Sequence, residues 1–516
     1  MISAPLDDSA RDLVDRLRRD LIAADYTVDT VRALWGAEAD AALTRGNRVP
    51  ARRALSGKRL PVPAAALARA LVLGDAVEVA ALAEALPALG IDGAIRLGLV
   101  AQTGGRLEPL LDLRPYAVLD EGGAAAWWIL SDLGEQARRG ALPADHVVGV
   151  GGASLTLAGL IPTSEVERVL DLGTGCGIQA LHAARHARAV IATDVSERAL
   201  RLAAITLRLN GAEAVELRRG DLYVPVAGEV FDRIISNPPF VITPRRDGVP
   251  RYEYRDGGRI GDGIVEEVVR GAAVHLAPGA SAHLLGNWEY RDALGGDGLV
   301  RVRRWAEESG LDAWIVERER QSPAQYAETW IRDGGTLVGS DDFDQLAEQW
   351  LDDFAHRGVT AVGFGYVVLR RPRAGAHPRL LRTERLHEPL GGAPTGIGDH
   401  LMLGFTAHDA IAPLDDVTLS ELRLQVASDV TEERHQWPGA DGPTVMRLRQ
   451  GGGFGRVIEA DAALAGLVGA CDGELSVGQI VGALAELLEV DERALTIELL
   501  PAVRELLLTG MLLLEP

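Results

Sequence analysis

The sequence predicts an α/β protein built on a mainly parallel sheet that is covered by helices on both faces. Two observations lead to this fold class. From about residue 168 to 371, short apolar runs alternate with amphipathic segments of helical period, and the runs are bounded by glycine and polar residues. At 516 residues the chain is also too long for one ordinary domain, so we expect further domains on both sides of the sheet.

The expected strands and helices alternate along this central segment. Strands are predicted at 168–172, 189–194, 215–218, 231–236, 282–285, 313–317 and 364–369. Helices are predicted at 178–186, 197–209, 264–275, 299–309 and 342–356. In such a sheet, ligands bind beyond the carboxyl ends of the strands, so site residues are expected there.

The two flanks of the sheet carry different signals. Residues 1–120 are mostly helical and end in a hairpin signal around Gly104-Gly105, which predicts an N-terminal helical domain with a winged helix as one form. The sheet domain is expected at 121–372. A linker and β-rich region is expected at 373–456, and a C-terminal winged-helix-like module at 457–516.

The composition indicates a globular protein without membrane spans or metal. Hydrophobic residues make up 47% of the chain and charged residues 25%, and no apolar run is long enough to cross a bilayer. The first residues lack signal-peptide features, and Cys176 and Cys471 form no metal-ligand pattern. We therefore expect a cytoplasmic protein. The net charge of -21 argues against binding nucleic acid by bulk electrostatics, although stretches 45–59 and 245–259 are arginine-rich.

The first chemical motif is the glycine-rich turn after the strand at 168–172. Gly173, Gly175 and Gly177 allow the backbone to take positive φ and to approach a ligand closely. Asp194 ends the next strand, where a carboxylate can accept hydrogen bonds from both hydroxyls of a ribose. This combination fits a nicotinamide cofactor as well as S-adenosylmethionine.

Two further strands end in polar motifs. Asp221, after the third strand, could accept a hydrogen bond from an adenine amino group. Asn237-Pro238-Pro239-Phe240 ends the fourth, and its prolines hold Asn237 in an extended, stiff conformation. The Asn237 amide oxygen, the Pro238 carbonyl and the Phe240 ring suit a planar NH2 group that donates two hydrogen bonds while its plane stacks.

With these four strand ends, residues 147–371 resemble the class I S-adenosylmethionine-dependent methyltransferases with an Asn/Asp-Pro-Pro-Phe/Tyr motif. That subgroup contains adenine-N6, guanine-N2 and release-factor glutamine methyltransferases. The resemblance implies a Rossmann-like seven-stranded core and catalytic roles for Asn237, Pro238 and Phe240. It implies that S-adenosylmethionine is held by Asp171, Gly173, Thr174, Gly175, Gly177, Asp194, Val195, Asp221, Leu222 and Asn237.

The substrate branch is matched less closely. Residues 254–264 are similar to the Gly-Gly-x-Asp-Gly-Leu stretch of the release-factor enzymes, but their Gly-Gly and Gly-Asp-Gly pieces are separated. Several rRNA enzymes have histidine after the aromatic residue, where this chain has Val241.

The sequence therefore predicts an N-methyltransferase acting on a planar nitrogen of a macromolecule. A nucleobase in RNA or DNA is the first expectation, because arginines follow Phe240 and the flanking modules could hold a large substrate. The acidic charge favours the alternative of a glutamine amide in a protein. A small-molecule or peptide tailoring enzyme is a further alternative. A binding protein on a disabled core is disfavoured by the intact glycines and by Asp194, Asp221 and Asn237.

Overall fold

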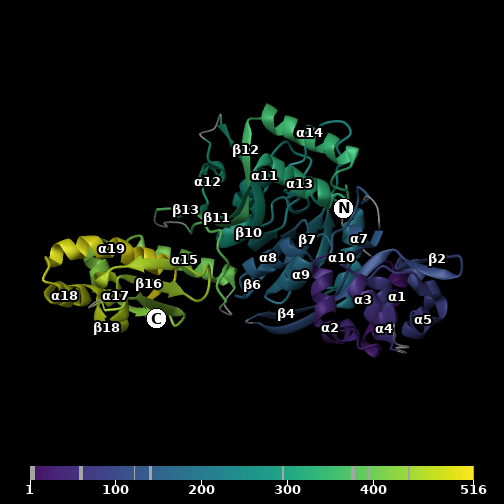
Figure 1. Cartoon of the computed structure of the whole chain (residues 1–516), viewed down its shortest axis with the longest axis horizontal. Coiled ribbons are helices and arrows are strands. Elements are labelled where there is room, and N and C mark those ends of the chain that lie inside the picture. The colour runs from purple at the N-terminus through teal and green to yellow at the C-terminus, as the bar shows by residue number, and fades with distance from the viewer. Residues whose placement is uncertain are drawn as a thin grey trace.

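The computed structural model describes residues 6–56, 62–120, 122–138, 142–292, 296–373, 378–392, 396–439 and 442–514. Figure 1 shows three parts in a row, with the N-terminal helices at one end, the large sheet in the middle and the C-terminal module at the other end. Within the described ranges, we find no helix that is both long and apolar enough to cross a membrane.

The central sheet has the strand order β13-β11-β12-β10-β9-β6-β7-β8. Its strands are β6 (Val166–Leu172), β7 (Ala187–Asp194), β8 (Glu216–Arg219), β9 (Phe231–Ser236), β10 (Leu276–Arg291), β11 (Asp312–Gln321), β12 (Val359–Arg370) and β13 (Leu381–Arg385). β12 runs antiparallel to its two neighbours, whereas β6, β7, β8 and β9 are parallel. The predicted α/β fold and its seven strands are confirmed. β13 adds an eighth strand from a segment that was expected to be a linker.

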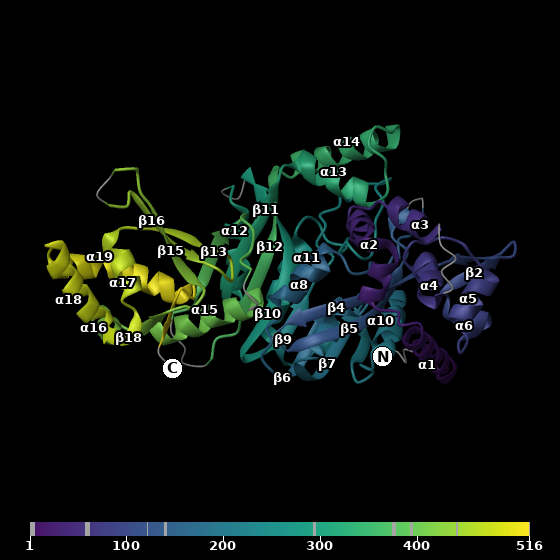
Figure 2. The same cartoon turned by 60° about the horizontal axis from the view of Figure 1, so that its bottom comes forward.

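Helices cover both faces of this sheet (Figure 2). They are α8 (Gly152–Leu160), α9 (Ile178–Ala183), α10 (Glu197–Leu209), α11 (Gly263–His275), α12 (Gly298–Glu308), α13 (Pro323–Asp333) and α14 (Asp341–His356), with a short 3-10 turn at Val224–Val226. The inner strands are apolar on both faces because helices cover each side, as in β9, where Ile234 and Ile235 are both fully buried. α13 was not predicted, although a capping box of Ser322 and Gln325 and a proline at its first turn mark its start.

The N-terminal part contains the expected helices. They are α1 (Asp8–Ala23), α2 (Val28–Thr44), α3 (Val49–Ser56), α4 (Pro63–Leu71), α5 (Val79–Ala85) and α6 (Gly90–Leu97). Three short strands, β1 (Val77–Glu78), β2 (Val100–Thr103) and β3 (Arg106–Pro109), form a sheet of order β1-β3-β2. The helical region is confirmed, and its interpretation as a winged helix stays a prediction.

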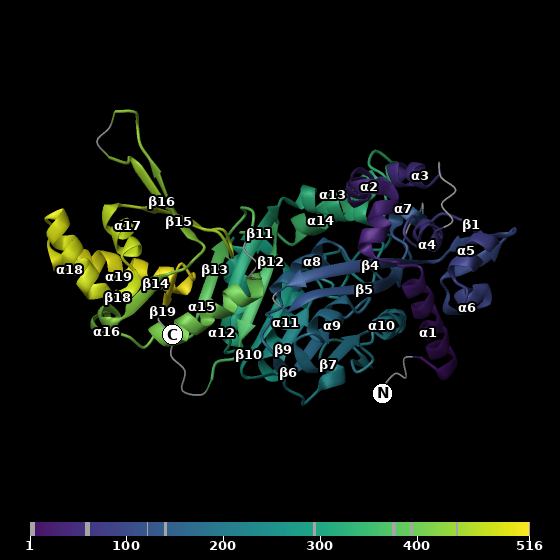
Figure 3. The ribbon, with the colours of Figure 1, turned by 90° about the horizontal axis from the view of Figure 1, so that it is seen from below.

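A long hairpin joins this part to the sheet domain. β4 (Leu111–Asp120) and β5 (Gly123–Asp132) pair along their whole length, so the boundary expected between 120 and 121 falls at the turn of this hairpin and stays a prediction. The hairpin lies against α9 and α10, as Figure 3 shows, and the backbone N–H of Leu130 donates to Thr206 of α10. α7 (Glu135–Arg138) follows. The N-terminal helices share one hydrophobic core with the sheet domain.

The C-terminal module has a hydrophobic core of its own that begins at Ile411. Its elements are α15 (Ile397–Ile411), α16 (Asp416–Glu421), β14 (Arg423–Val426), β15 (Val430–His435), β16 (Val445–Gln450), β17 (Val457–Ala460), α17 (Ala462–Gly469), β18 (Asp472–Ser476), α18 (Val477–Leu488), α19 (Glu492–Leu508) and β19 (Leu512–Leu514). Strands and helices on both sides of the boundary expected at 457 pack into this core, so that boundary stays a prediction. The region 373–456, where a linker and strands were expected, contributes β13 to the large sheet and also holds α15 and α16.

Candidate active site

The four predicted strand ends meet at one edge of the sheet. Leu172 at the end of β6 lies opposite Thr193 of β7 and Ser236 of β9, and Asp194 lies opposite Arg219 at the end of β8. The glycine loop, Asp194, Asp221 and Asn237 directly follow or end these four strands. The structure therefore brings together the four groups that the sequence placed at a common edge.

The glycine loop turns from β6 into α9. Gly175 has φ of +55° and Gly177 has φ of +87°, both in the region that L side chains rarely adopt. A Cβ on Gly177 would meet Ala203 of α10 at 3.3 Å, so this glycine permits close helix packing. A Cβ on Gly175 would meet nothing within 4 Å. The loop thus leaves open space beside Gly175, where a ligand can approach the backbone.

Two carboxyl groups flank this loop, the buried Asp171 and the half-buried Asp194. Thr174 donates to Asp171 Oδ2 at 2.7 Å, whereas the buried Oδ1 of Asp171 has no hydrogen-bond partner among the described residues. Burial raises the pKa of Asp171 to about 7. Asp194 accepts from the backbone N–H groups of Gly175 and Ser196, both at 2.9 Å, and burial raises its pKa as well. A partnerless carboxylate oxygen in a buried site favours a cationic ligand group.

The third strand end is more open. Asp221 has a 57% exposed side chain and pairs with Arg259 at 3.0 Å. Leu222 holds a positive φ of 44°, and Val195 is 54% exposed. An exposed carboxylate at this edge can accept a hydrogen bond from an amino group, and nearby apolar side chains can contact a flat ring.

The fourth strand end carries Asn237, Pro238 and Phe240. The Oδ1 atom of Asn237 is buried and has no hydrogen-bond partner among the described residues. The position of a Cβ on Gly173 lies 4.0 Å from the Asn237 carbonyl oxygen, so the glycine loop and the Asn-Pro-Pro-Phe turn are neighbours. A free, buried amide oxygen is the acceptor that a substrate NH2 group requires.

Aromatic side chains that the sequence did not indicate surround Phe240. The centroid of its ring lies 5.5 Å from the ring centroid of Phe364 of β12 and 6.4 Å from that of Trp330 of α13. Phe240 itself is buried, with 8% of its surface exposed. Phe240 therefore packs with residues that lie about 90 to 125 positions further along the chain. We call the part of the site from Asn237 to Phe240, with these packing residues, the acceptor side.

Ion pairs neutralise the arginine-rich stretch after Phe240. Four of its five arginines contact acids: Arg245 with Asp256, Arg246 with Asp352, Arg255 with Asp333, and Arg259 with Asp221 and Glu267. The fifth, Arg251, is exposed. The other arginine-rich stretch, 45–59, is described only to residue 56, so Lys58 and its neighbours lie outside the described residues. The stretch 245–259 does not form a strongly positive surface.

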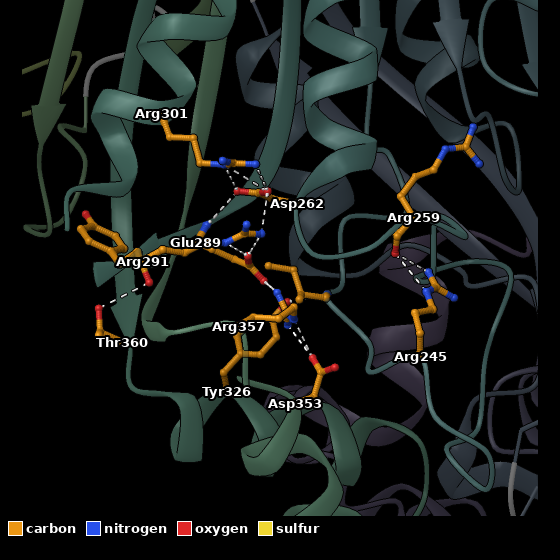
Figure 4. Close-up of polar contacts among 12 residues, drawn as sticks. Arg245, Arg259, Asp262, Glu289, Arg291, Arg301, Tyr326, Asp353, Arg357 and Thr360 are labelled. Carbon is orange, nitrogen blue, oxygen red and sulfur yellow. Dashed lines mark hydrogen bonds and ion pairs between the residues drawn. The ribbon is translucent and has the colours of Figure 1, made fainter. Parts of the chain in front are cut away.

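A buried charge cluster lies at the end of the loop between β9 and α11, residues 237–262, which we call the acceptor loop (Figure 4). Asp262 accepts from the Glu289 backbone N–H at 3.0 Å and pairs with Arg301 at 3.0 Å. Glu289 pairs with Arg291 and Arg357. Asp262 and Glu289 are almost fully buried. The cluster ties the start of α11 to the end of β10, to α12 and to α14, so Asp262 is a structural acid.

A separate cavity of about 210 Å³ lies between the β4–β5 hairpin, α8 and α9. Tyr116, His182 and Gly396 are among its lining residues, and no predicted site residue lines it. We find no group of three or more His, Cys, Asp or Glu side chains with metal-binding geometry in the part of the chain that the structure describes.

Three family models match the chain. Residues 149–290 match the methyltransferase small domain, and two domains of unknown function, DUF7059 and DUF7782, match residues 23–110 and 411–514. The strand order and the glycine loop define the class as a Rossmann-like methyltransferase.

Curated relatives identify the family. The release factor glutamine methyltransferase of Xylella fastidiosa (strain Temecula1) is 32% identical over an alignment of 228 residues, and the match covers 38% of this chain and 82% of the relative. At this identity and coverage, the chain belongs to the family of the release factor glutamine methyltransferases.

Other relatives are matched over a smaller part of their length. The ribosomal protein uL3 glutamine methyltransferase of Bradyrhizobium diazoefficiens is 41% identical over 127 residues, 23% of this chain, and the chain spans only 39% of its length. The ribosomal RNA small subunit methyltransferase C of Escherichia coli is 33% identical over 26% of this chain and 35% of its own. A solved methyltransferase from Pyrococcus furiosus is 18% identical over 41% of this chain and 77% of its own, with a TM-score of 0.25.

Proposed function

We propose that this protein is an S-adenosylmethionine-dependent N-methyltransferase whose acceptor is the primary amide of a glutamine in a protein. The observation that carries the proposal is the buried, partnerless Oδ1 of Asn237, which lies on a stiff turn next to the glycine loop. Few native proteins leave a buried amide oxygen without a partner unless a ligand or water completes it.

The residues at the edge fit S-adenosylmethionine, which carries a methyl group on a positively charged sulfur and brings a cationic amino group. The partnerless Oδ1 of Asp171 and the open space beside Gly175 suit the amino acid end. Asp194 would accept the ribose hydroxyls. Asp221, with Leu222 and Val195, would hold the adenine.

On the acceptor side, the chain's contribution is to orient a nitrogen. Asn237 Oδ1 and the Pro238 carbonyl would each accept one N–H of a planar NH2 group, and Phe240 would support its plane. Two acceptors fix the direction of the nitrogen lone pair, and they polarise both N–H bonds. Positioning of this kind is the main source of catalysis expected for an in-line displacement at carbon.

The charge of the protein and its similarity to glutamine methyltransferases favour a protein amide over a nucleobase as the substrate. Most arginines after Phe240 are paired with acids, and the net charge is -21, so the acceptor side offers little to a phosphate backbone. Two relatives, 41% and 38% identical over their matched parts, are named ribosomal protein uL3 glutamine methyltransferases.

A nucleobase in RNA is the second candidate. Phe240, Phe364 and Trp330 gather beside the acceptor turn, and aromatic rings can stack on an exposed base. The ribosomal RNA methyltransferase among the relatives agrees with this candidate.

Methyl labelling distinguishes the two. The purified protein and tritiated S-adenosylmethionine are incubated with extract from cells that lack the gene, and the products are treated with protease or nuclease. We expect label that protease removes and that amino acid analysis assigns to a methylated glutamine. Label that only nuclease removes would establish the nucleobase candidate, and a protein that binds no S-adenosylmethionine would refute both. Asn237→Ala protein is the control for a contaminating enzyme.

A further inference from the structure

A helical hairpin stands at the acceptor end of the sheet. β11 is parallel to β10, because both are antiparallel to β12, so β11 ends at the same edge as β9 and β10. The chain inserts α13 and α14 between β11 and β12 at this edge, and Figures 1 and 2 both show the two helices beyond the amino end of β12. The insertion therefore lies over the acceptor side of the site.

Tyr326 of α13 bonds to the main chain of the acceptor loop. Its hydroxyl accepts from the backbone N–H of Ile242 at 3.0 Å and from the amide of Asn287 on β10. The side chain is 3% exposed, and its ring packs against Trp330 and Trp350. Because the ring is enclosed by neighbouring aromatic rings, the hydroxyl holds Ile242 at a fixed place.

Further contacts join the same helix to the same loop. The backbone N–H of Val241 donates to the Arg255 carbonyl at 2.8 Å. Arg255, which is 5% exposed, donates to the Trp330 carbonyl at 2.8 Å and to Asp333 at 2.7 Å. α13 thus holds the loop at Ile242 and again at Arg255.

The link from Ile242 back to Asn237 is short and stiff. It contains Pro238 and Pro239, whose φ angles are fixed, and the buried ring of Phe240. A shift of Ile242 would therefore move Asn237 with it. A displacement of about 1 Å at a reacting group can cost about 100-fold in rate.

We propose that Tyr326 is a positioning residue for methyl transfer: by holding Ile242, it fixes the direction in which Asn237 presents its amide oxygen to the acceptor nitrogen. This inference rests on the proposed N-methyl transfer. It makes the α13–α14 hairpin the part of this chain that adapts a general methyltransferase core to its own acceptor.

The test compares two tyrosine-to-phenylalanine variants. Tyr326→Phe removes the hydroxyl and keeps the ring, and Tyr26→Phe removes a buried hydroxyl that donates to Leu113 at 2.9 Å in the N-terminal part. We expect Tyr326→Phe to lower the turnover of tritiated methyl into extract protein about 10- to 100-fold at saturating S-adenosylmethionine, as a displaced reacting group should. Its calorimetric Kd for S-adenosylmethionine should stay within about twofold of wild type, because the residue touches only the acceptor side. Tyr26→Phe should leave both quantities within about twofold.

Two results would overturn the inference. One is a Tyr326→Phe turnover within about twofold of wild type, and the other is an equal loss of S-adenosylmethionine affinity, which indicates general distortion. If Tyr326→Phe does not fold, Ile242→Pro removes the backbone N–H that donates to the Tyr326 hydroxyl, and an unchanged turnover in that variant overturns the inference too. A wild-type protein that binds S-adenosylmethionine but methylates nothing in the extract would refute the proposed function instead.

Discussion

The donor side of the site, which is the glycine loop with Asp171, Asp194 and Asp221, and the acceptor side around Asn237 are built in different ways. On the donor side the contacts are local: Thr174 and Asp171 are 3 residues apart, and Gly175 and Asp194 are 19 apart. On the acceptor side, Ile242 and Tyr326 are 84 residues apart, and Glu289 and Arg357 are 68 apart. The donor side is thus held together by contacts that are close in sequence, whereas the acceptor side depends on the distant α13–α14 hairpin.

The strongest way to break the acceptor side alone is to disturb its buried charges. Glu289→Gln removes the buried carboxylate that pairs with both Arg291 and Arg357, and we expect the free energy of unfolding to fall by about 3–5 kcal/mol. Urea unfolding followed by tryptophan fluorescence measures this. Glu197→Gln, which breaks an exposed pair with Arg219, is the matched control and should cost less than about 1 kcal/mol. Equal costs in the two variants would show that the cluster does not support the fold.

Asn237→Ala should separate chemistry from donor binding. Removing the amide oxygen takes away one of two acceptors for the substrate nitrogen, and we expect turnover to fall about 100- to 1000-fold. Single-turnover methyl transfer measures the loss. A variant that retains more than about a third of wild-type turnover would rule out the catalytic role assigned to Asn237.

Asp194→Ala should weaken S-adenosylmethionine binding and change turnover much less. It removes both proposed contacts to the ribose and leaves the Gly175 N–H without its partner, so S-adenosylmethionine affinity should fall about 10- to 100-fold. Equilibrium dialysis with labelled S-adenosylmethionine measures the affinity. Turnover at saturating S-adenosylmethionine should fall much less, and an affinity equal to that of wild type would refute the assignment of Asp194.

The smallest expected effect is a pH dependence of donor binding. Burial raises the pKa of Asp171 to about 7, so the free site holds a proton below this pH. A cationic ligand favours the ionised form, and binding must therefore release that proton as long as the pH lies below 7. Affinity should rise as the pH increases from 5.5 to 7, by at most about tenfold per unit. Calorimetry in two buffers of different ionisation enthalpy should detect the released proton in wild type and lose it in Asp171→Asn.

The sequence could place the donor-side residues at one edge of the sheet because their signals are local. The glycines, Asp194 and Asp221 follow apolar strands directly, and parallel strands bring their carboxyl ends to one edge. Asn237 could be found for the same reason.

The acceptor partners could not be predicted in this way. Tyr326, Trp330 and Phe364 look like ordinary core residues in the sequence, and only tertiary packing brings them to Phe240. The arginines after Phe240 indicated a basic patch, but the acids that pair with Arg246 and Arg255 lie on α14 and α13. The hydrophobic core that begins at Ile411 could likewise not be predicted, because tertiary contacts and not composition define it.

The claim that the two sides are separable can be tested by a double-mutant cycle. Calorimetry would measure S-adenosylmethionine binding to wild type, Asp194→Ala, Asn237→Ala and the double variant. Independence predicts that Asp194→Ala weakens binding equally in both backgrounds, with a coupling free energy below about 0.5 kcal/mol. A coupling above about 1 kcal/mol would show that Asn237 and Asp194 act as one site, which would contradict a separate acceptor side.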